Sequence, residues 1–134
     1  KNHQRMTEIR AEKITKLANR IPDLSLEGGG DADLLVIGWG GTYGSLHTAV
    51  KRANAHGKKV AYLHFNYINP MPKNTAELLS KYKKILVAEL NLGQMVKILR
   101  DRFPENDFQG YNKVQGMPFT VEELMNKFEE VLNS

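Results

Sequence analysis

The residues that could do chemistry in this chain begin with a glycine-rich turn, GWGGTYG, which spans Gly38–Gly44 and follows an apolar run. Dinucleotide-binding turns read Gly-x-Gly-x-x-Gly, because glycine lets the backbone approach a pyrophosphate at a helix N-terminus. Here the glycines read Gly-x-Gly-x-x-x-Gly, and Tyr43 stands at the third fingerprint position. The next apolar run ends in HFN without an acidic residue, and no Gly-Lys-Ser/Thr is present. The spacing therefore does not predict a dinucleotide site.

Two interpretations of this turn remain open. In the first, it is a tight connection from strand to helix, and the hydroxyl of Thr42 or Ser45 caps the free backbone N–H groups. In the second, Gly40, Gly41 and Thr42 use those donors to bind an anion weakly. The departures from the nucleotide patterns favour the first interpretation.

Two polar clusters follow later apolar runs. The motif ELNLGQ carries Glu89, Asn91 and Gln94, and the motif NKVQGMPF carries Asn112 and Gln115. Because α/β sheets place their sites at the carboxyl ends of strands, both clusters are expected at one edge of the sheet. There they could bind a ligand or form hydrogen bonds with a neighbouring domain. We treat these residues as candidates for an interface or an anion site.

Other reactive constellations are missing from the sequence. The four histidines have no metal-ligand spacing, and His64 lies in an apolar strand, where a hydrogen-bonded structural histidine is expected. No Ser-His-Asp order, nucleophile elbow or carboxylate pair supports hydrolysis. The 134 residues include no cysteine, which excludes disulfides, thiol catalysis and iron–sulfur ligation within the chain. We therefore predict no catalytic residue, no cofactor-binding residue and no metal ligand here.

The positive charge is concentrated near the N-terminus. The formal net charge is +4, and residues 1–20 hold six basic and two acidic residues, which is the whole excess. A nucleic-acid-binding protein carries a basic face on its folded body, so no nucleic acid is expected as a partner.

No apolar run approaches the roughly 20 residues of a membrane span, and no apolar signal core is present. We expect a cytoplasmic protein without membrane contact, and a fragment of a longer chain because it does not begin with Met.

The alternation of apolar patterns predicts an α/β domain. Residues 1–22 are predicted as a linking helix over 2–20 that Pro22 ends, and a glycine-rich linker over 22–33 leaves room for a short strand at 24–26. Residues 23–134 form the domain, in which Thr120 and Glu123 predict a capping box. Connections of this length favour parallel strands with helices on both faces, a three-layer α/β/α domain with a mostly parallel sheet. The predicted strands are 34–38, 59–65, 84–90 and 108–114, and the predicted helices are 45–56, 75–82, 92–103 and 120–132.

Four sequence blocks, in this order, resemble a known family: LLVIGWGGTYG, HFNYINPMPKN, ILVAELNLGQM and YNKVQGMPFTVEEL. They are similar to the C-terminal part of the alpha subunit of 2-oxoacid:ferredoxin oxidoreductases, above all of the 2-oxoglutarate type. The resemblance covers nearly all of residues 1–134, and the last two blocks separate the chain from transketolases and dehydrogenase E1 components. It implies a fold similar to the transketolase C-terminal domain, with about five strands, one of them antiparallel. Residues 24–26 are the candidate for that strand.

The resemblance also implies an activity for the full complex. Such enzymes of anaerobic metabolism convert 2-oxoglutarate and coenzyme A to succinyl-CoA and carbon dioxide, and pass electrons to ferredoxin. Thiamine diphosphate, Mg²⁺ and an iron–sulfur cluster are implied for the complex, with the rest of the alpha subunit and the beta subunit as partners. The family's Gly-Asp-Gly and Asn-Asn motif is absent, since Gly30-Asp31 is followed by Ala. The domain alone is therefore expected to be inactive and to serve assembly. The alternative is a stand-alone α/β module that binds a phosphate or nucleotide at Gly38–Gly44.

Overall fold

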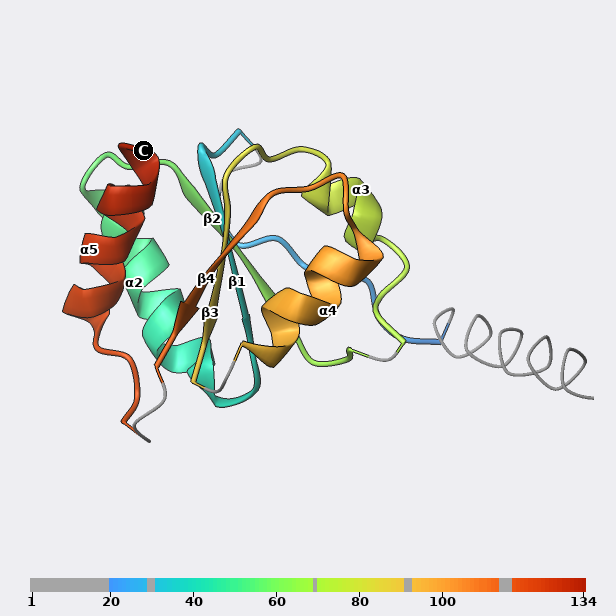
Figure 1. Ribbon diagram of the computed structural model, residues 1–134. Coiled ribbons are helices and arrows are strands. Elements are labelled where there is room, and N and C mark those ends of the chain that lie inside the picture. The colour runs from blue at the N-terminus through green and yellow to red at the C-terminus, as the bar shows by residue number, and fades with distance from the viewer. Residues whose placement is uncertain (1–19, 29–30, 69, 91–92, 114–116) are drawn as a thin grey trace, which may run out of the picture.

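Four parallel strands form the sheet in the computed structural model, which describes residues 20–28, 31–68, 70–90, 93–113 and 117–134. Their order across the sheet is β2-β1-β3-β4, and Figure 1 shows the strands at the centre with helices on either side. The strands are β1 (Leu34–Trp39), β2 (Val60–Phe65), β3 (Ile85–Glu89) and β4 (Phe108–Asn112). A short 3₁₀ turn, η1 (Gly40–Thr42), precedes α2 (Tyr43–Ala55), and the other helices are α3 (Thr75–Leu79), α4 (Gln94–Arg102) and α5 (Val121–Leu132).

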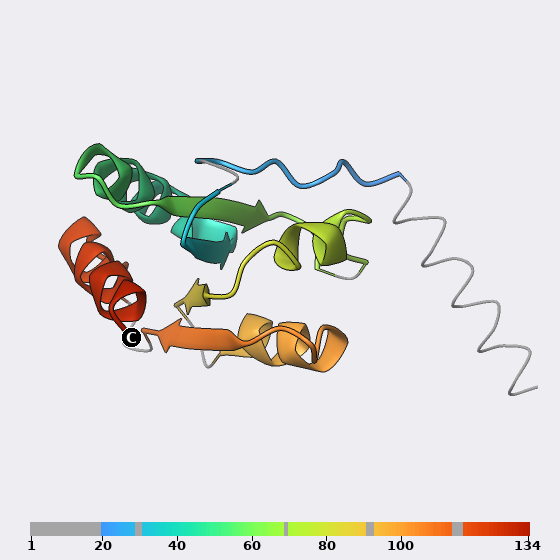
Figure 2. The same ribbon diagram turned by 90° about the horizontal axis from the view of Figure 1, so that it is seen from above.

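Helices cover both faces of the sheet, with α2 and α5 on one side and α3 and α4 on the other (Figure 2). Successive side chains of a strand point to opposite faces. Leu34 and Val36 of β1 therefore pack with α2 and α5, whereas Leu35 and Ile37 pack with α3 and α4. All four are fully buried, which explains why the strand reads as a continuous apolar run. The predicted three-layer α/β/α arrangement is confirmed.

The helix ends follow local chemistry. The Thr120 hydroxyl oxygen accepts a hydrogen bond from the backbone N–H of Glu123 at 3.1 Å, as an N-cap residue should. The Glu123 carboxylate does not complete the predicted capping box. The carboxylate instead lies 2.6 Å from the ammonium group of Lys113. Lys113 directly follows β4, and its side chain reaches the first turn of α5. This ion pair joins the end of the sheet to α5.

The sheet has four strands in the described residues, where about five were predicted, and residues 24–26 form no strand. The segment before β1, residues 20–28, is called the lead-in here. Its one contact of strand type is an antiparallel bridge between Glu27 and Tyr62 on the outer edge of β2. Leu24 instead exchanges two backbone hydrogen bonds with the side-chain amide of Asn74. Gly28 follows at φ 92°, and a Cβ there would lie 2.6 Å from the Val60 carbonyl oxygen, so a side chain has no room against β2 at this position.

The other boundaries differ from the prediction by a few residues. Helix α2 begins at Tyr43, earlier than predicted, because the 3₁₀ turn leads directly into it. The helix predicted over 2–20 lies outside the described residues except for its last residue, so the division at residue 22 stays a prediction. Among the described residues, no helix is both long enough and apolar enough to cross a membrane.

Candidate functional site

The carboxyl ends of β1 and β3 enclose the point where the chain order reverses. After β1 the chain crosses to β2 on one side, and β3 lies on the other side of β1. Ligands of α/β proteins bind in the crevice at such a point. A hollow of about 250 Å³ lies there, lined by Trp39, Gly40, Gly41, Thr42 and Leu90. The structure therefore places the predicted glycine turn at this switch point.

The glycines of the turn meet two different requirements. A Cβ at Gly38 would contact Leu46 and would lie 2.6 Å from the Tyr62 hydroxyl oxygen, so a side chain has no room there. Gly40 has φ 64° with open space around it, so its requirement is conformational. Gly41 and Gly44 also face open space. Packing and backbone geometry therefore account for Gly38 and Gly40 without a nucleotide.

The predicted hydroxyl cap at this turn is wrong. The Thr42 hydroxyl donates to the carbonyl oxygen of Trp39 at 3.0 Å and does not cap η1 or α2. Within the part of the chain that the structure describes, the Ser45 hydroxyl caps no helix N–H either. Anion binding by Gly40, Gly41 and Thr42 is not tested by this geometry and stays a prediction.

Glu89, the last residue of β3, points into the protein rather than toward a partner. Its side chain is fully buried and accepts three hydrogen bonds. Two come from the first turn of α4, from Met95 N at 2.7 Å and Val96 N at 3.0 Å, and the third comes from Trp39 Nε1 at 3.1 Å. A carboxylate of the chain itself thus occupies the helix N-terminus where an external anion would bind. This corrects the interpretation of Glu89 as an interface or ligand residue.

The remaining candidates divide by position. Gln94, at the start of α4, and Asn112, at the end of β4, are both exposed. Asn112 pairs in register with Glu89, and a Cβ on Gly93 would lie 2.7 Å from the Asn112 amide nitrogen. The prediction that the two polar motifs meet at one edge of the sheet is therefore confirmed. Asn91 and Gln115 lie outside the described residues.

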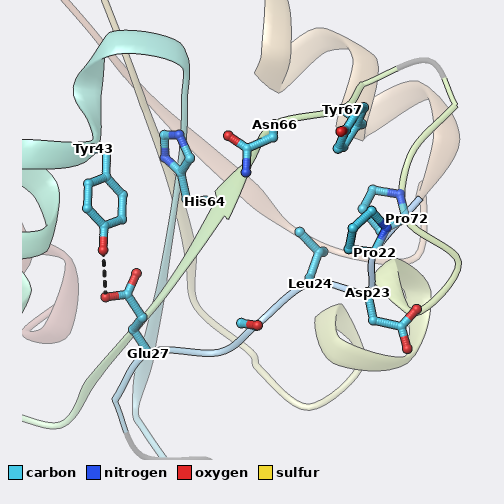
Figure 3. A pocket seen from close by; sticks show the side chains of 10 residues that line it. Pro22, Asp23, Leu24, Glu27, Tyr43, His64, Asn66, Tyr67 and Pro72 are labelled. Carbon is cyan, nitrogen blue, oxygen red and sulfur yellow. Dashed lines mark hydrogen bonds between the residues drawn. The ribbon is translucent and has the colours of Figure 1, made fainter. Parts of the chain in front are cut away.

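A larger hollow, of about 560 Å³, lies at the carboxyl end of β2 and is called the β2-end pocket here (Figure 3). Residues of the lead-in, Tyr43 of α2, His64 of β2 and the loop residues Asn66 and Tyr67 line it. No sequence motif predicted this pocket. Polar residues follow β2 directly, as they follow β3 in the motif ELNLGQ, and this pattern could have indicated a site at the end of β2. The contribution of the lead-in depends on the bridge from Glu27 to β2, which no local pattern reveals.

Three rings and one carboxylate form a cluster at this pocket, of which Tyr43, His64 and Glu27 line the pocket wall. The Tyr43 ring stacks on His47, with ring centroids 5.2 Å apart, and meets His64 edge-on at 5.1 Å. Glu27 Oε1 accepts a hydrogen bond from the Tyr43 hydroxyl at 3.3 Å and lies 2.6 Å from His47 Nδ1. Through these contacts Glu27 ties the lead-in to α2.

His64 is held by a hydrogen bond, as predicted, and it also faces the pocket. The Tyr62 hydroxyl lies 2.7 Å from His64 Nδ1. Burial, with a smaller contribution from Glu27, raises the pKa of Tyr62 far above its usual value, so the phenol keeps its proton and can donate. Burial lowers the pKa of His64, and the charge of Glu27 opposes this only in part. We therefore assign a neutral imidazole that accepts at Nδ1 and carries its proton on Nε2.

The described residues do not fit the cofactors that the resemblance implies for the complex. No group of three or more His, Asp or Glu residues among them could hold a metal ion. The N-terminus of α4, which could receive a diphosphate, is filled by the Glu89 carboxylate. The chain also has no cysteine to ligate an iron–sulfur cluster.

Comparisons of sequence place this domain among known proteins. Residues 32–124 match the family model of the pyruvate:ferredoxin oxidoreductase core domain II. The chain is 42% identical, over 92% of its length, to the 2-oxoglutarate oxidoreductase subunit KorA of Mycobacterium tuberculosis. It is 30% identical, over 93% of its length, to the 2-oxoglutarate synthase subunit KorA of Methanothermobacter marburgensis. The chain spans 18% and 34% of the lengths of these two relatives.

Comparisons of structure agree with those of sequence. A 2-oxoglutarate:ferredoxin oxidoreductase from Magnetococcus marinus, solved with 2-oxoglutarate, coenzyme A and succinyl-CoA bound, matches 98% of this chain and 23% of its own. The TM-score is 0.85 and the sequence identity is 30%. A split-gene transketolase matches 82% of this chain and 41% of its own, with a TM-score of 0.61 and 18% identity, which supports the predicted transketolase-like fold alone. The chain therefore belongs to the core domain II family of pyruvate:ferredoxin oxidoreductases, as its resemblance to 2-oxoacid:ferredoxin oxidoreductase alpha subunits implies.

Proposed function

We propose that this chain is one domain of the alpha subunit of a 2-oxoglutarate:ferredoxin oxidoreductase. The observation that carries the proposal is the 42% identity to a 2-oxoglutarate oxidoreductase subunit across nearly the whole chain. The full enzyme oxidatively decarboxylates 2-oxoglutarate in the presence of coenzyme A, yields succinyl-CoA and carbon dioxide, and passes the electrons to ferredoxin. Thiamine diphosphate, Mg²⁺ and the iron–sulfur cluster are held by other domains or subunits, in a cytoplasmic complex.

Within that enzyme, the domain serves assembly. The buried Glu89 network fixes the carboxyl edge of the sheet and leaves the side chains of Gln94 and Asn112 exposed beside it. A rigid edge with exposed amides suits an interface, because such groups form hydrogen bonds to a partner with little reorganisation. We propose that this edge, with Asn91 and Gln115, faces the rest of the alpha subunit or the beta subunit.

Reconstitution tests the proposal. The remaining alpha sequence and the beta subunit are produced without this domain, and the 134-residue chain is then added back. We expect co-elution on a sizing column and restored dye reduction that depends on 2-oxoglutarate and coenzyme A. The chain alone, supplied with thiamine diphosphate and Mg²⁺, should show no turnover. Turnover by the chain alone, or no association with correctly folded partners, would contradict the proposal.

A pair of variants tests the assigned edge. The double variant Gln94→Ala with Asn112→Ala should weaken association while leaving thermal unfolding of the free chain unchanged, because both side chains are exposed. The matched control is Asn126→Ala, an exposed amide on α5 away from this edge, which should associate like the wild type. Equal weakening in the control would show that the edge is not the contact surface.

A further inference from the structure

The β2-end pocket has no role in the proposed assembly edge, yet its lining is chemically distinctive. Its lining residues include no lysine and no arginine. Leu24 and Pro22 of the lead-in and Pro72 of the loop after β2 form an apolar wall (Figure 3). Glu27, on the opposite side, contributes a carboxylate. The pocket therefore combines an apolar surface with negative charge.

Glu27 keeps one carboxylate oxygen for a ligand. Both of its side-chain contacts, with the Tyr43 hydroxyl and with His47 Nδ1, are made through Oε1. Within the described residues, Oε2 accepts no hydrogen bond, and the Glu27 side chain is 31% exposed. The Asp23 carboxylate, by contrast, points away from the other lining side chains (Figure 3). Glu27 is thus the carboxylate that a group inside the pocket would meet.

Aromatic rings supply the second recognition element. Tyr43 is 42% exposed beside Glu27, and Tyr67 is 49% exposed on the far side of the pocket (Figure 3). Exposed tyrosine rings attract cations through the ring quadrupole. The Asn66 side chain lies between the two and adds an amide oxygen as an acceptor. His64 does not repel a cation, because burial lowers its pKa and keeps it neutral near pH 7.

We propose that the β2-end pocket binds a guanidinium group on an aliphatic stem, with Glu27 Oε2 as the acceptor of the guanidinium and the Tyr67 ring, on the far side, as a surface that packs on the stem. A guanidinium is planar and carries five N–H donors, so it can bond to the Glu27 carboxylate while its stem extends toward Tyr67. Its aliphatic stem would pack against the apolar wall formed by Pro22, Leu24 and Pro72. The group comes either from an arginine side chain of a protein segment or from a free guanidino compound. Only the first source rests on the proposed function, in which other segments of the enzyme adjoin this domain.

Nuclear magnetic resonance titration of the 134-residue chain tests this site. The probes are the capped peptide acetyl-Gly-Arg-Gly-amide, agmatine, and a matched peptide with neutral citrulline in place of arginine. We expect saturable shifts at Glu27, His64 and Tyr67 with the guanidinium probes and none with citrulline. Tighter binding of the peptide identifies a protein segment as the source, and tighter binding of agmatine identifies a free compound. Equal binding of citrulline, or no saturable shift with either guanidinium probe, would overturn the proposal.

Two variants locate the binding. Glu27→Gln and Tyr67→Ala should each weaken guanidinium binding by about three- to fivefold, the size expected for the loss of an exposed ion pair or of partial apolar packing on the stem. Tyr67→Ala changes an exposed side chain, so it remains informative if Glu27→Gln disturbs the lead-in. The control Glu105→Gln, an exposed carboxylate beyond α4 at the other end of the sheet, should bind like the wild type. Unchanged affinity in both variants would overturn the proposal, whether or not reconstitution of the enzyme succeeds.

Discussion

The indole N–H of Trp39 donates a hydrogen bond to the buried carboxylate of Glu89 at 3.1 Å, so the last residues of β1 and β3 are joined directly. The same carboxylate accepts the backbone N–H groups of Met95 and Val96. One side chain thus fixes two strands and a helix at the point where the chain order reverses. Without this carboxylate, the buried N–H groups of Met95 and Val96 would lack a partner in the interior.

The first prediction concerns this carboxylate. Glu89→Ala should lower the free energy of unfolding by about 3 kcal/mol or more, because it leaves the two buried N–H groups of α4 unsatisfied, removes the acceptor of the part-buried Trp39 indole and opens a cavity. Glu89→Gln should cost less, since the amide oxygen still accepts. Urea unfolding followed by the fluorescence of Trp39, the only tryptophan of the chain, measures both variants. The exposed control Glu105→Ala should stay within about 0.5 kcal/mol of the wild type. A similar value for Glu89→Ala would contradict the assigned role.

The second prediction separates the glycines of the turn. Gly38→Ala should destabilise the chain by about 1–3 kcal/mol, because the added methyl group meets Leu46 and the Tyr62 hydroxyl. Gly41→Ala, which meets open space without a positive φ, should be neutral or stabilising by less than about 1 kcal/mol. Equilibrium unfolding in urea compares the two. Equal effects would show that crowding at Gly38 is not the constraint.

The sequence predicted the elements of this fold because each of them is a local pattern. A strand covered on both faces must be apolar along its length, as in Leu34–Trp39. Thr120 indicates the start of α5 because an N-cap side chain bonds to a backbone N–H only three residues along the chain. The contacts that shape the site are not local. Trp39 and Glu89 are 50 residues apart, and Glu27 reaches His47 across 20 residues. The buried direction of the Glu89 side chain and the β2-end pocket therefore emerge only from the packed structure.

The third prediction concerns acid stability. The folded-state pKa of His64 is lowered by burial, while the unfolded chain has an ordinary histidine pKa of about 6.5. Below that value the unfolded chain binds the proton more readily. Stability contributed by neutral His64 is therefore present above about pH 6.5 and is lost as the pH falls through the folded-state pKa. The charge of Glu27 limits the effect, and Tyr43 and Tyr62 stay neutral throughout this range.

The readout is the slope of the unfolding free energy between about pH 7 and about pH 5. His64→Gln should reduce the fall in stability relative to the wild type, because it removes the group that must be protonated on unfolding. The control His56→Gln changes an exposed histidine at the end of α2 and should keep the wild-type slope. The interpretation fails if the His64 variant loses as much stability toward acid as the wild type.

The fourth prediction compares two buried phenols. The Tyr62 hydroxyl bonds to His64 Nδ1, whereas the Tyr82 hydroxyl is buried and finds no hydrogen-bond partner among the described residues. Tyr62→Phe should therefore cost about 1 kcal/mol, and Tyr82→Phe should be neutral or stabilising, because it removes a polar atom that is buried without a bond. Tyr62→Phe should also raise the pKa of His64, since the lost hydrogen bond favours the neutral imidazole. Histidine titration by nuclear magnetic resonance detects that rise. An unchanged His64 pKa in Tyr62→Phe would show that the phenol does not donate to Nδ1.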